Sequence, residues 1–500
     1  MPLNSFKLGS NPTLEDVAAV AAAGRKAAFA SSARRRAAAS RLVLEKAMAA
    51  GRAIYGVNTG FGELASTRIS RERLTQMQRN LVLSHACGVG EPLSQQESRA
   101  ILFLRVNELS RGFSGVRPAL IEHLVAMLDA GIAPLIPSRG SVGASGDLAP
   151  QAHMALAVIG EGDVLRRGRR VGARQALRRA GLRPFVLAEK EGLALLNGTQ
   201  AMQSVGGLAL LSAERVWRAC TLACAASLDA LTGTPAPYDE AVSRLKPHPG
   251  QIAAARALRR LLEGSDIRRS HAVGDPRVQD SYSLRCAPQV HGAVLDRLAE
   301  ARRVVEIEMR SVTDNPLIVG GRVISGGNFH GQALSFAFDS AAGAMTALAN
   351  MSERRSFQLT AAAAPRLKAF LAADPGVESG YMIAQYAAAA LASENKTLAH
   401  PASADSVPTS ANKEDFVSMG MWSALKFKRV VWNAAQVAAI ELVCAAQAIE
   451  FHRPLRSGRG VERALAILRS QVKASRGDEV LSGKLETARE MILSGAFEED

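Results

Sequence analysis

"MWSALKFKRVVWNAAQVAAIELVCAAQAIEFHR", residues 421–453, contains neither glycine nor proline. Its apolar side chains recur three and four positions apart, which is the spacing that places them on one face of an α-helix. At a rise of 1.5 Å per residue, an uninterrupted helix of this length spans on the order of 50 Å. The stretch therefore predicts one long helix.

Three further stretches of the chain show a similar pattern of apolar residues: 202–231, 293–313 and 333–362. Long helices bury their apolar faces by packing against one another, so the four stretches together predict a helical bundle. TDNP at 313–316 and RPL at 453–455 fit this interpretation, because proline and the residue before it stop a helix. We expect residues 201–500 to form a central and C-terminal elongated bundle of long antiparallel helices.

The first 200 residues differ, because glycine, proline, asparagine and threonine interrupt them often. YGVNTGFG (55–62) and HACGVGEP (85–92) are typical of loops and short helices folded around a site. Alternating apolar and polar runs are few, and FVLAEK (185–190) and PLIVGGRVISGG (316–327) are the best candidates for a small hairpin. We therefore expect a mainly α protein with a loop-rich N-terminal domain over residues 1–200.

The composition is that of a globular protein, since 48% of the 500 residues are hydrophobic and 21% are charged. Lysine and arginine outnumber aspartate and glutamate by 61 to 46, which gives a net charge of +15. A basic surface can bind nucleic acid, but these basic clusters are not interleaved with stacking aromatic residues, which make up only 5% of the chain. A solvated basic surface is therefore favoured over a nucleic-acid site.

Local patterns disfavour a secreted protein, a membrane protein and a protein with a metal or redox site. The opening MPLNSFKLGSNPTLEDV lacks the pattern of a secretory signal, and no apolar run approaches the roughly 20 residues of a membrane helix. The five cysteines form no C-x-x-C pair, and the nine histidines have no metal-ligand spacing. We expect a cytoplasmic protein without a membrane segment, a metal or a nucleotide.

One short stretch, GSVGASGDLAP (140–150), is rich in glycine, alanine and serine. A phosphate-binding P-loop is excluded, because no lysine follows Gly146. A nucleophile elbow is excluded as well, because Asp147 stands where the second glycine of G-x-S-x-G should be. A purely structural turn remains one interpretation of the stretch.

The chemistry of Ala144-Ser145-Gly146 offers another interpretation. The nitrogen of glycine has the least hindered flanking carbon of any residue, so the Gly146 nitrogen can approach the Ala144 carbonyl if the turn is tight enough. The Ser145 hydroxyl can leave as water. Cyclisation and two dehydrations would then give a five-membered ring with an exocyclic methylene, which is an electrophile made from the chain itself.

This stretch resembles the prosthetic-group loop of the histidine and aromatic amino acid ammonia-lyase family, in which Ala-Ser-Gly forms 4-methylideneimidazol-5-one. The resemblance runs through nearly the whole chain in the family's order. It is carried by IYGVNTGFGELAS (54–66), NLVLSHACGVGEPL (80–93), PSRGSVGASGDLAPQAHMALAVIGEG (137–162), ALLNGTQAM (194–202), RVQDSYSLRCAPQVHGA (277–293), VTDNPL (312–317), SGGNFHGQ (325–332), ALASENKTLAHPASADSVPTSANKEDFVSMG (390–420) and FHRPL (451–455). It implies that Ala144, Ser145 and Gly146 form this group.

The resemblance also implies roles for residues outside this loop. Tyr55 matches the tyrosine that removes the β-proton of the substrate, and Asn197 matches a residue beside the prosthetic group. Arg285 matches the arginine that binds the substrate carboxylate. Gln279 and Tyr282, which the family also uses at the site, would share one helical face with Arg285 if that segment is helical.

Two more positions match the family's site, and each candidate also has an ordinary structural interpretation. Phe329 would form an aromatic wall, and Asp147 lies next to the ring-forming triad. The structural alternatives are a packing tyrosine, a solvated arginine, a core phenylalanine, an Asx turn at Asn197 before Gly198, and a helix N-cap at Asp147.

The choice of substrate depends on His85 and Glu414. Ser84-His85 and the glutamate resemble the histidine branch of the family, and imidazole and carboxylate groups can hydrogen-bond the two ring nitrogens of a histidine substrate. Four positions depart from that branch, which commonly has Gln, His, Gln and Asn there: Lys413, Phe416, Ala287 and Glu378. We expect Lys413 to neutralise Glu414 and to compete with the substrate for it.

The resemblance therefore implies an ammonia-lyase that converts L-histidine to trans-urocanate and ammonia. It also implies a homotetramer, because active sites of the family draw on more than one chain. The departures leave open a lyase or 2,3-aminomutase that acts on another aryl or modified-histidine amino acid. A catalytically silent binding protein is a third interpretation, suggested only by the net charge of +15.

Overall fold

The computed structural model describes residues 5–22, 25–166 and 168–498. The chain divides into two compact units, each made of three segments. Unit 1 consists of Met1–Leu208, Arg302–Phe338 and Pro401–Leu425. Unit 2 consists of Ala209–Ala301, Asp339–His400 and Lys426–Asp500.

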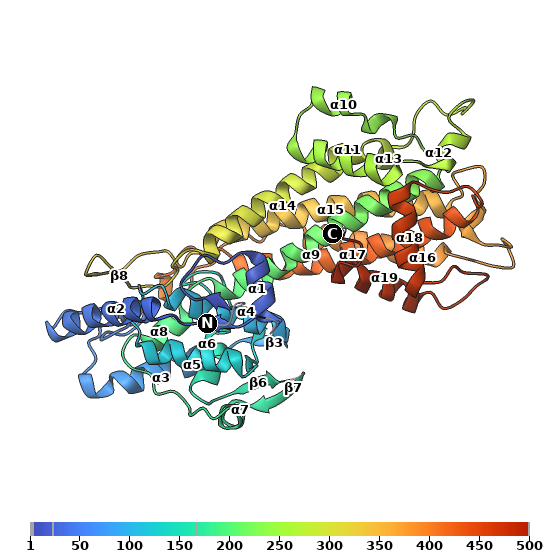
Figure 1. Cartoon of the computed structure of the whole chain (residues 1–500). Helices are drawn as coiled ribbons and strands as arrows, with labels where there is room; N and C mark the ends of the chain where they lie inside the picture. Colours follow the sequence, from blue (N-terminus) through green and yellow to red (C-terminus); the bar gives the residue numbers. More distant parts are fainter. Residues whose placement is uncertain (1–4, 23–24, 167, 499–500) are drawn as a thin grey trace. The chain divides into compact units, whose positions relative to one another are not determined.

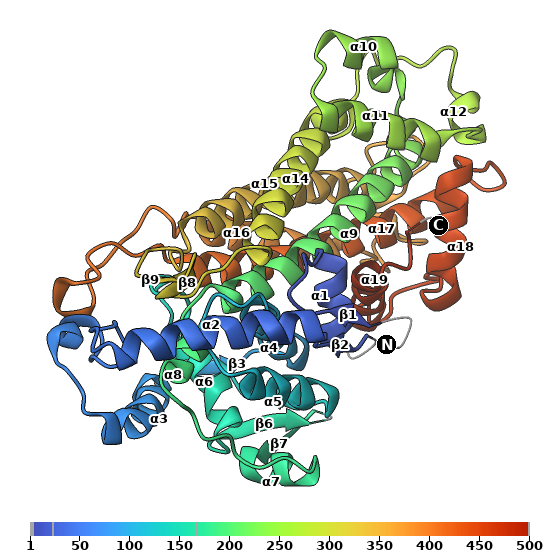
Figure 2. The same cartoon turned by 60° about the vertical axis from the view of Figure 1, so that its left-hand side comes forward.

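Four long helices are the largest elements: α9 (Gln200–Ala230), α14 (Ala287–Met309), α15 (Gln332–Thr360) and α17 (Gly420–Glu450). Their unit 2 portions run side by side (Figure 1, Figure 2). Each coincides with one of the four stretches predicted to be a long helix, with ends that differ by a few residues. The predicted mainly α fold is confirmed.

The helix α17 is the most hydrophobic of the four. By length and mean hydropathy it could cross a membrane, although Asn433, Gln436 and Glu441 interrupt its apolar residues. In the structure 89% of its most apolar window is buried inside the protein. A helix that is apolar on all sides belongs in a protein core, so its burial identifies α17 as a core helix.

Shorter elements complete unit 2: α10 (Glu240–Leu245), α11 (Pro249–Leu262), α12 (Asp266–Ser270), α13 (Tyr282–Arg285), α16 (Met382–Leu398), α18 (Arg459–Gln471), α19 (Ser482–Ser494), and the 3-10 turns η3 (Ala236–Tyr238) and η4 (Ala369–Leu371). Buried polar groups fix α13. Arg355, which is ion-paired with Glu441, donates to the Ser283 carbonyl at 3.1 Å. The Tyr238 hydroxyl donates to the Leu284 carbonyl at 2.9 Å.

Unit 1 is built mainly from shorter helices: α1 (Leu14–Ala21), α2 (Ser31–Ala49), α3 (Leu74–His85), α4 (Gln95–Leu109), α5 (Pro118–Asp129), α6 (Leu148–Val158), α7 (Ala173–Arg179), α8 (Glu191–Leu196), and the 3-10 turns η1 (Gly62–Ser66), η2 (Arg71–Arg73) and η5 (Ser410–Asn412). The central helix is α4, because every residue from Glu97 to Leu109 is buried. It begins with a capping box, in which Ser94 and Glu97 each accept from the other's backbone N–H.

The strands are short. β1 (Phe6–Lys7) pairs with β2 (Ala27–Ala28), β3 (Val89–Pro92) with β5 (Pro137–Arg139), and β8 (Leu317–Val319) with β9 (Arg322–Ile324), while β6 (Asp163–Arg166) pairs with β4 (Ala133–Pro134) on one side and β7 (Arg169–Gly172) on the other. The hairpin predicted within 316–327 is confirmed as β8–β9. Its turn residues Gly320 and Gly321 have φ angles of +56° and +72°, as a tight hairpin turn requires. The strand predicted at 185–190 is wrong, because this segment pairs with no strand and leads into α8.

The predicted domain boundary at residue 200 lies near the first division between the units, at residue 208. Residues 302–338 and 401–425 belong to unit 1, although the sequence placed them with the helical bundle. A hydrophobic cluster gives one reason, because Ile318 packs there with Leu44 and Val57. Such contacts join distant segments and leave no local pattern.

Candidate functional site

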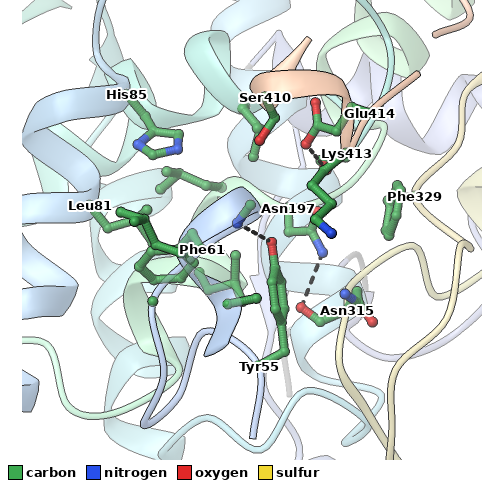
Figure 3. Close-up of a pocket in the computed structure, with 18 of the residues that line it drawn as sticks. Tyr55, Phe61, Leu81, His85, Asn197, Asn315, Phe329, Ser410, Lys413 and Glu414 are labelled. Carbon is green, nitrogen blue, oxygen red and sulfur yellow. Dashed lines mark hydrogen bonds between the residues drawn. The ribbon is translucent and has the colours of Figure 1, made fainter. Parts of the chain in front are cut away.

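Unit 1 contains a cavity of about 1130 Å³. Its wall is formed by segments that lie far apart in the sequence: the loop from Tyr55 to Ile69, helix α3, residues 144–148, the end of α8, and parts of 315–330 and 410–416. Figure 3 shows side chains from these segments converging on one space. Within the described residues, no cluster of three or more His, Cys, Asp or Glu side chains could hold a metal ion.

Most of the predicted site residues line this cavity: Tyr55, His85, Ala144, Ser145, Asn197, Phe329 and Glu414. Gly146, the residue after Ser145, is buried. Gln279, Tyr282 and Arg285 belong to unit 2 and are absent from the described residues that line the cavity. A single cavity thus gathers seven residues of unit 1 that were predicted from scattered motifs.

The turn at Ala144-Ser145-Gly146 has an unusual backbone. Ser145 and Gly146 have φ angles of +50° and +70°, in the left-handed region that residues with a side chain rarely adopt. Gly146 forms an isolated bridge with Gly198, and a Cβ atom on Gly146 would lie 1.9 Å from the Gly198 carbonyl oxygen. Glycine is therefore required at 146, because the two backbones are in direct contact.

Hydrogen bonds hold the residues around this turn. The Gly198 N–H donates to the Ser145 carbonyl at 3.3 Å, and the Asp147 N–H donates to the Gly198 carbonyl at 2.7 Å. In the part of the chain that the structure describes, nothing hydrogen-bonds the Gly146 N–H or the Ala144 carbonyl oxygen. These are the two groups that ring closure would join, so the turn fits the cyclisation predicted from its sequence.

Buried side chains fix the loop opposite this turn, which contains Asn197 and Gly198. The Gln151 side-chain nitrogen donates to the Gly198 carbonyl at 2.7 Å and to the Leu196 carbonyl at 2.9 Å. The fully buried Arg105 donates to the Asn197 carbonyl at 2.6 Å. The loop cannot shift without leaving buried polar groups unpaired, which is unfavourable.

Asp147 occupies the N-cap position of α6, but its side chain makes no capping hydrogen bond there. The carboxylate instead accepts from the Met202 N–H, in the first turn of α9, at 2.8 Å. Its other oxygen accepts from Ser141 Oγ at 2.8 Å. The predicted capping of α6 by Asp147 is therefore wrong. Its carboxylate instead binds an N–H group in the first turn of α9. Complete burial raises the pKa of Asp147 to about 6.

This raised pKa predicts a pH-dependent stability. The folded state binds a proton at Asp147 more tightly than the unfolded chain does, so the contribution is fully present below about pH 4 and is lost as the pH rises through about 6. At about 1.4 kcal/mol for each pH unit between the two pKa values, it is on the order of 3 kcal/mol. As the pH rises from about 4 to about 7, we expect the urea midpoint of the wild type to decrease relative to that of Asp147→Asn. A difference between the two urea midpoints that does not change with pH would contradict this prediction.

Tyr55 lies on the loop that forms one wall of the cavity. Its hydroxyl oxygen accepts a hydrogen bond from the Gly62 N–H at 3.1 Å. Its ring packs edge-on against Phe61, with 6.3 Å between the ring centroids. Figure 3 shows the hydroxyl directed into the cavity. An N–H that donates to the phenolic oxygen stabilises negative charge there.

Glu414 and His85 supply the polar groups predicted to select the substrate. One carboxylate oxygen of Glu414 accepts from Ser145 Oγ at 3.0 Å, and the other accepts from Thr409 Oγ1 at 2.9 Å. The His85 Nδ1 lies 3.1 Å from Ser84 Oγ. Burial lowers the pKa of His85, although the charge of Glu414 opposes this effect, so the imidazole is neutral near pH 7.

The predicted pairing of Lys413 with Glu414 is wrong. The Lys413 Nζ lies 3.7 Å from the carboxylate of Glu63, in η1. The two side chains are 61% and 58% exposed, so the pair contributes little to stability. Lys413 also lines the cavity, but the carboxylate of Glu414 accepts from the hydroxyls of Ser145 and Thr409.

The other departures from the histidine branch lie in different places. Phe416 lines the cavity and stacks on His330, with 5.9 Å between the ring centroids. Ala287 and Glu378 belong to unit 2. Within unit 1, therefore, Phe416 is the departure that adds apolar surface to the cavity.

The structure also disagrees with the ordinary structural interpretations of two residues, which were an Asx turn at Asn197 and a core side chain at Phe329. The Asn197 Nδ2 donates to the Asn315 main-chain carbonyl at 3.2 Å, so its side chain holds a distant segment instead of the following turn. Phe329 is half-buried and lines the cavity, where a core phenylalanine would be fully buried. Figure 3 shows Phe329 at the edge of the group of side chains.

Tyr282 and Arg285 lie on the short helix α13 of unit 2. Gln279 precedes this helix, because Ser281 has an extended backbone (φ −62°, ψ 159°) and the helix begins only at Tyr282. The prediction that the three share one helical face is therefore wrong. Tyr282 is 70% exposed, and the Arg285 guanidinium lies over its ring, 4.6 Å from the centroid.

Sequence reasoning missed several polar residues that hold the cavity wall: the buried Arg105, Gln151, Lys190 and Asp314, and the half-buried Thr409. Each contacts a residue of the cavity or of its supporting loops. The available indication was a polar residue inside an otherwise apolar stretch, such as Gln151 in LAPQAHMALAV. Such residues are buried in a folded protein only when they are hydrogen-bonded.

Three comparisons relate the chain to known proteins. A model of the family described as aromatic amino acid lyase matches residues 13–470. A protein of Anaeromyxobacter sp. (strain K) named histidine ammonia-lyase is 49% identical, over 98% of each chain. A histidine ammonia-lyase structure from Trypanosoma cruzi has a TM-score of 0.91 at 38% identity, covering 98% of this chain and 94% of that one. A tyrosine aminomutase structure from Streptomyces globisporus has a TM-score of 0.93 at 35% identity, covering 99% and 97%.

Proposed function

Because the chain belongs to the aromatic amino acid lyase family, we propose that it is a carbon–nitrogen lyase that converts L-histidine to trans-urocanate and ammonia in the cytoplasm. The observation that carries this proposal is the cavity of unit 1, which Tyr55, Ser145 and Glu414 line together. Similarity over nearly full length to proteins named histidine ammonia-lyase supports the choice of histidine.

The prosthetic group of this proposal is 4-methylideneimidazol-5-one, formed from Ala144, Ser145 and Gly146. The geometry of the turn supports it, since the Gly146 N–H and the Ala144 carbonyl have no hydrogen-bond partner among the described residues. Once formed, such a group supplies an electrophile that makes the substrate's amine a better leaving group.

The chain's own side chains perform the remaining steps. Tyr55 removes the β-proton, and the Gly62 N–H stabilises the charge on its phenolic oxygen. Glu414 accepts a hydrogen bond from one nitrogen of the substrate's imidazole ring, and the neutral His85 pairs with the other. The aromatic ring of Phe329 limits the cavity on one side and excludes water from the substrate.

The residues that bind the substrate carboxylate complete the site only in an oligomer. Arg285 does not line the cavity of its own chain, so the proposal includes a homotetramer in which α13 of one chain supplies Tyr282 and Arg285 to another. Two observations support this arrangement: Tyr282 is largely exposed, and the buried Arg285 Nε has no hydrogen-bond partner among the described residues. A guanidinium fork suits a carboxylate.

A second candidate is a 2,3-aminomutase or a lyase that acts on another aryl or modified-histidine amino acid. Two observations favour it: the similarity to a tyrosine aminomutase structure, and the ring of Phe416 in the cavity. An aminomutase returns the amine to the β-carbon, so its product keeps the nitrogen. The two candidates therefore differ in whether ammonia is released.

Product analysis with L-histidine, L-phenylalanine and L-tyrosine tests the proposal. We expect equal amounts of urocanate and ammonia from L-histidine, with a kcat/KM at least about 100-fold above that for the other two, because a phenyl ring leaves Glu414 and His85 unpaired. A β-amino acid product would favour the second candidate. If the purified chain is lighter than its sequence by two water molecules and yields no urocanate, the proposed activity is wrong.

A further inference from the structure

A buried ion pair lies behind the part of the cavity wall that Asn197 forms. Lys190 and Asp314 are both 0% exposed. The Lys190 Nζ donates to both carboxylate oxygens of Asp314 at 2.7 Å and to the Asn315 main-chain carbonyl at 3.2 Å. An ammonium group has three donors, so these three hydrogen bonds use all of them.

Asn197 shares the acceptors of Lys190. Its Nδ2 donates to the same Asn315 carbonyl at 3.2 Å and lies 3.5 Å from an Asp314 carboxylate oxygen. A main-chain carbonyl can only accept, so the amide nitrogen must face it, and the Asn197 Oδ1 is turned the other way. Asn197 lines the cavity, and the dashed line in Figure 3 marks its bond to Asn315.

The main chain of Lys190 also contributes to this arrangement of Lys190, Asp314 and Asn197. Lys190 immediately precedes α8, the short helix that ends just before Asn197, and its carbonyl accepts from the Ala194 N–H at 2.8 Å. Its φ angle is +73°, in the left-handed region, which a residue with a long side chain adopts only when the surrounding structure enforces it. The main chain of Lys190 therefore fixes the start of α8. Its ammonium group also binds the Asn315 carbonyl, which orients Asn197, the residue after the end of α8.

We propose that Lys190 is a positioning residue for the lyase reaction: with Asp314 it holds the Asn197 amide in one orientation, so that Oδ1 accepts a hydrogen bond from the substrate's amino group. The inference rests on the proposed function. The departing nitrogen carries N–H donors, and an acceptor fixed in place stabilises it as the carbon–nitrogen bond breaks. Without the ammonium, the Asp314 carboxylate keeps only the Asn315 N–H at 2.7 Å among its close donors, and the Asn197 Nδ2, at 3.5 Å, can turn toward it.

The variant Lys190→Met tests this role. We expect kcat for L-histidine to fall about 100-fold, because the amide turns toward Asp314 and its acceptor is misplaced. We expect KM to change less than about threefold, because other residues bind the ring and the carboxylate. The intact mass is expected to remain lower than that of the sequence by two water molecules, as in the wild type. An unprocessed mass would overturn the proposal, because the pair would then act in ring formation.

A double variant, Lys190→Met with Asp314→Leu, separates positioning from stability. It removes the uncompensated buried charge, so we expect its urea midpoint to recover toward that of the wild type. We expect kcat to stay low, because the Asn315 carbonyl that accepts from Asn197 is no longer held by the Lys190 ammonium group. Recovery of kcat in the double variant, or a wild-type kcat in Lys190→Met, would overturn the proposal.

The adjacent ion pair offers a matched control. Glu191, in the first turn of α8, is fully buried and pairs with Arg117 at 2.6 Å, and neither residue lines the cavity. The variant Arg117→Met with Glu191→Leu is expected to keep kcat within about twofold of the wild type, because this pair has no contact with Asn197. If the wild type forms no urocanate, the proposed function fails. If it forms urocanate and the Lys190 variants match it, only this inference fails.

Discussion

Replacing Ser145 by alanine is expected to lower kcat for L-histidine by at least about three orders of magnitude, which is about 4 kcal/mol of transition-state stabilisation. Alanine has no hydroxyl to leave as water, so the exocyclic methylene of the proposed electrophile cannot form. Intact mass spectrometry checks the cause directly. The wild type should be lighter than its sequence by two water molecules, and the Ser145→Ala chain should not.

The fold of this variant should be intact. Serine and alanine both carry a Cβ atom, so the φ angle of +50° at position 145 strains them equally. The variant Ser114→Ala is a matched control, because Ser114 is 1% exposed and its hydroxyl has no hydrogen-bond partner within the described residues. It should keep both the mass and the kcat of the wild type. If Ser145→Ala keeps full activity, the proposed electrophile does not exist.

The variant Tyr55→Phe is expected to lower kcat by about 100- to 10,000-fold, which is the range for loss of a general base. Phenylalanine keeps the edge-on contact with Phe61 but has no oxygen to accept the β-proton or the Gly62 N–H. Because Tyr55 acts after the prosthetic group has formed, the intact mass should equal that of the wild type. Steady-state kinetics together with the mass therefore separate loss of the base from loss of the electrophile.

Tyr381→Phe is the matched control for this change. Tyr381 is 2% exposed in unit 2, and its hydroxyl lies 2.7 Å from Ser475 Oγ. Burial raises the pKa of Tyr381 to about 12, so it remains a neutral phenol at working pH. Loss of its hydroxyl should lower the free energy of unfolding by about 1 kcal/mol and leave kcat unchanged. If Tyr55→Phe loses as little activity as this control, another group takes the proton.

The sequence by itself determined the long helices and the β8–β9 hairpin. Their signals are local: a helical period without glycine or proline over 421–453, and two glycines between short apolar runs at 320 and 321. It also determined the family, because motifs such as those around Tyr55 and Ser145 occur in the family's order along the chain. Most of the site residues that the resemblance implied line the cavity.

Only the tertiary structure decided which of these residues meet and what holds them. Ser145 and Glu414 are hydrogen-bonded although 269 positions separate them, and the partners of Lys190 lie more than a hundred positions away. It also paired Lys413 with Glu63, and it left Tyr282, which belongs to unit 2, out of the residues that line the cavity of unit 1. A periodic pattern reports which face of a segment is apolar, but the partner of a buried polar group depends on which distant segment packs against it, and no local pattern encodes that choice.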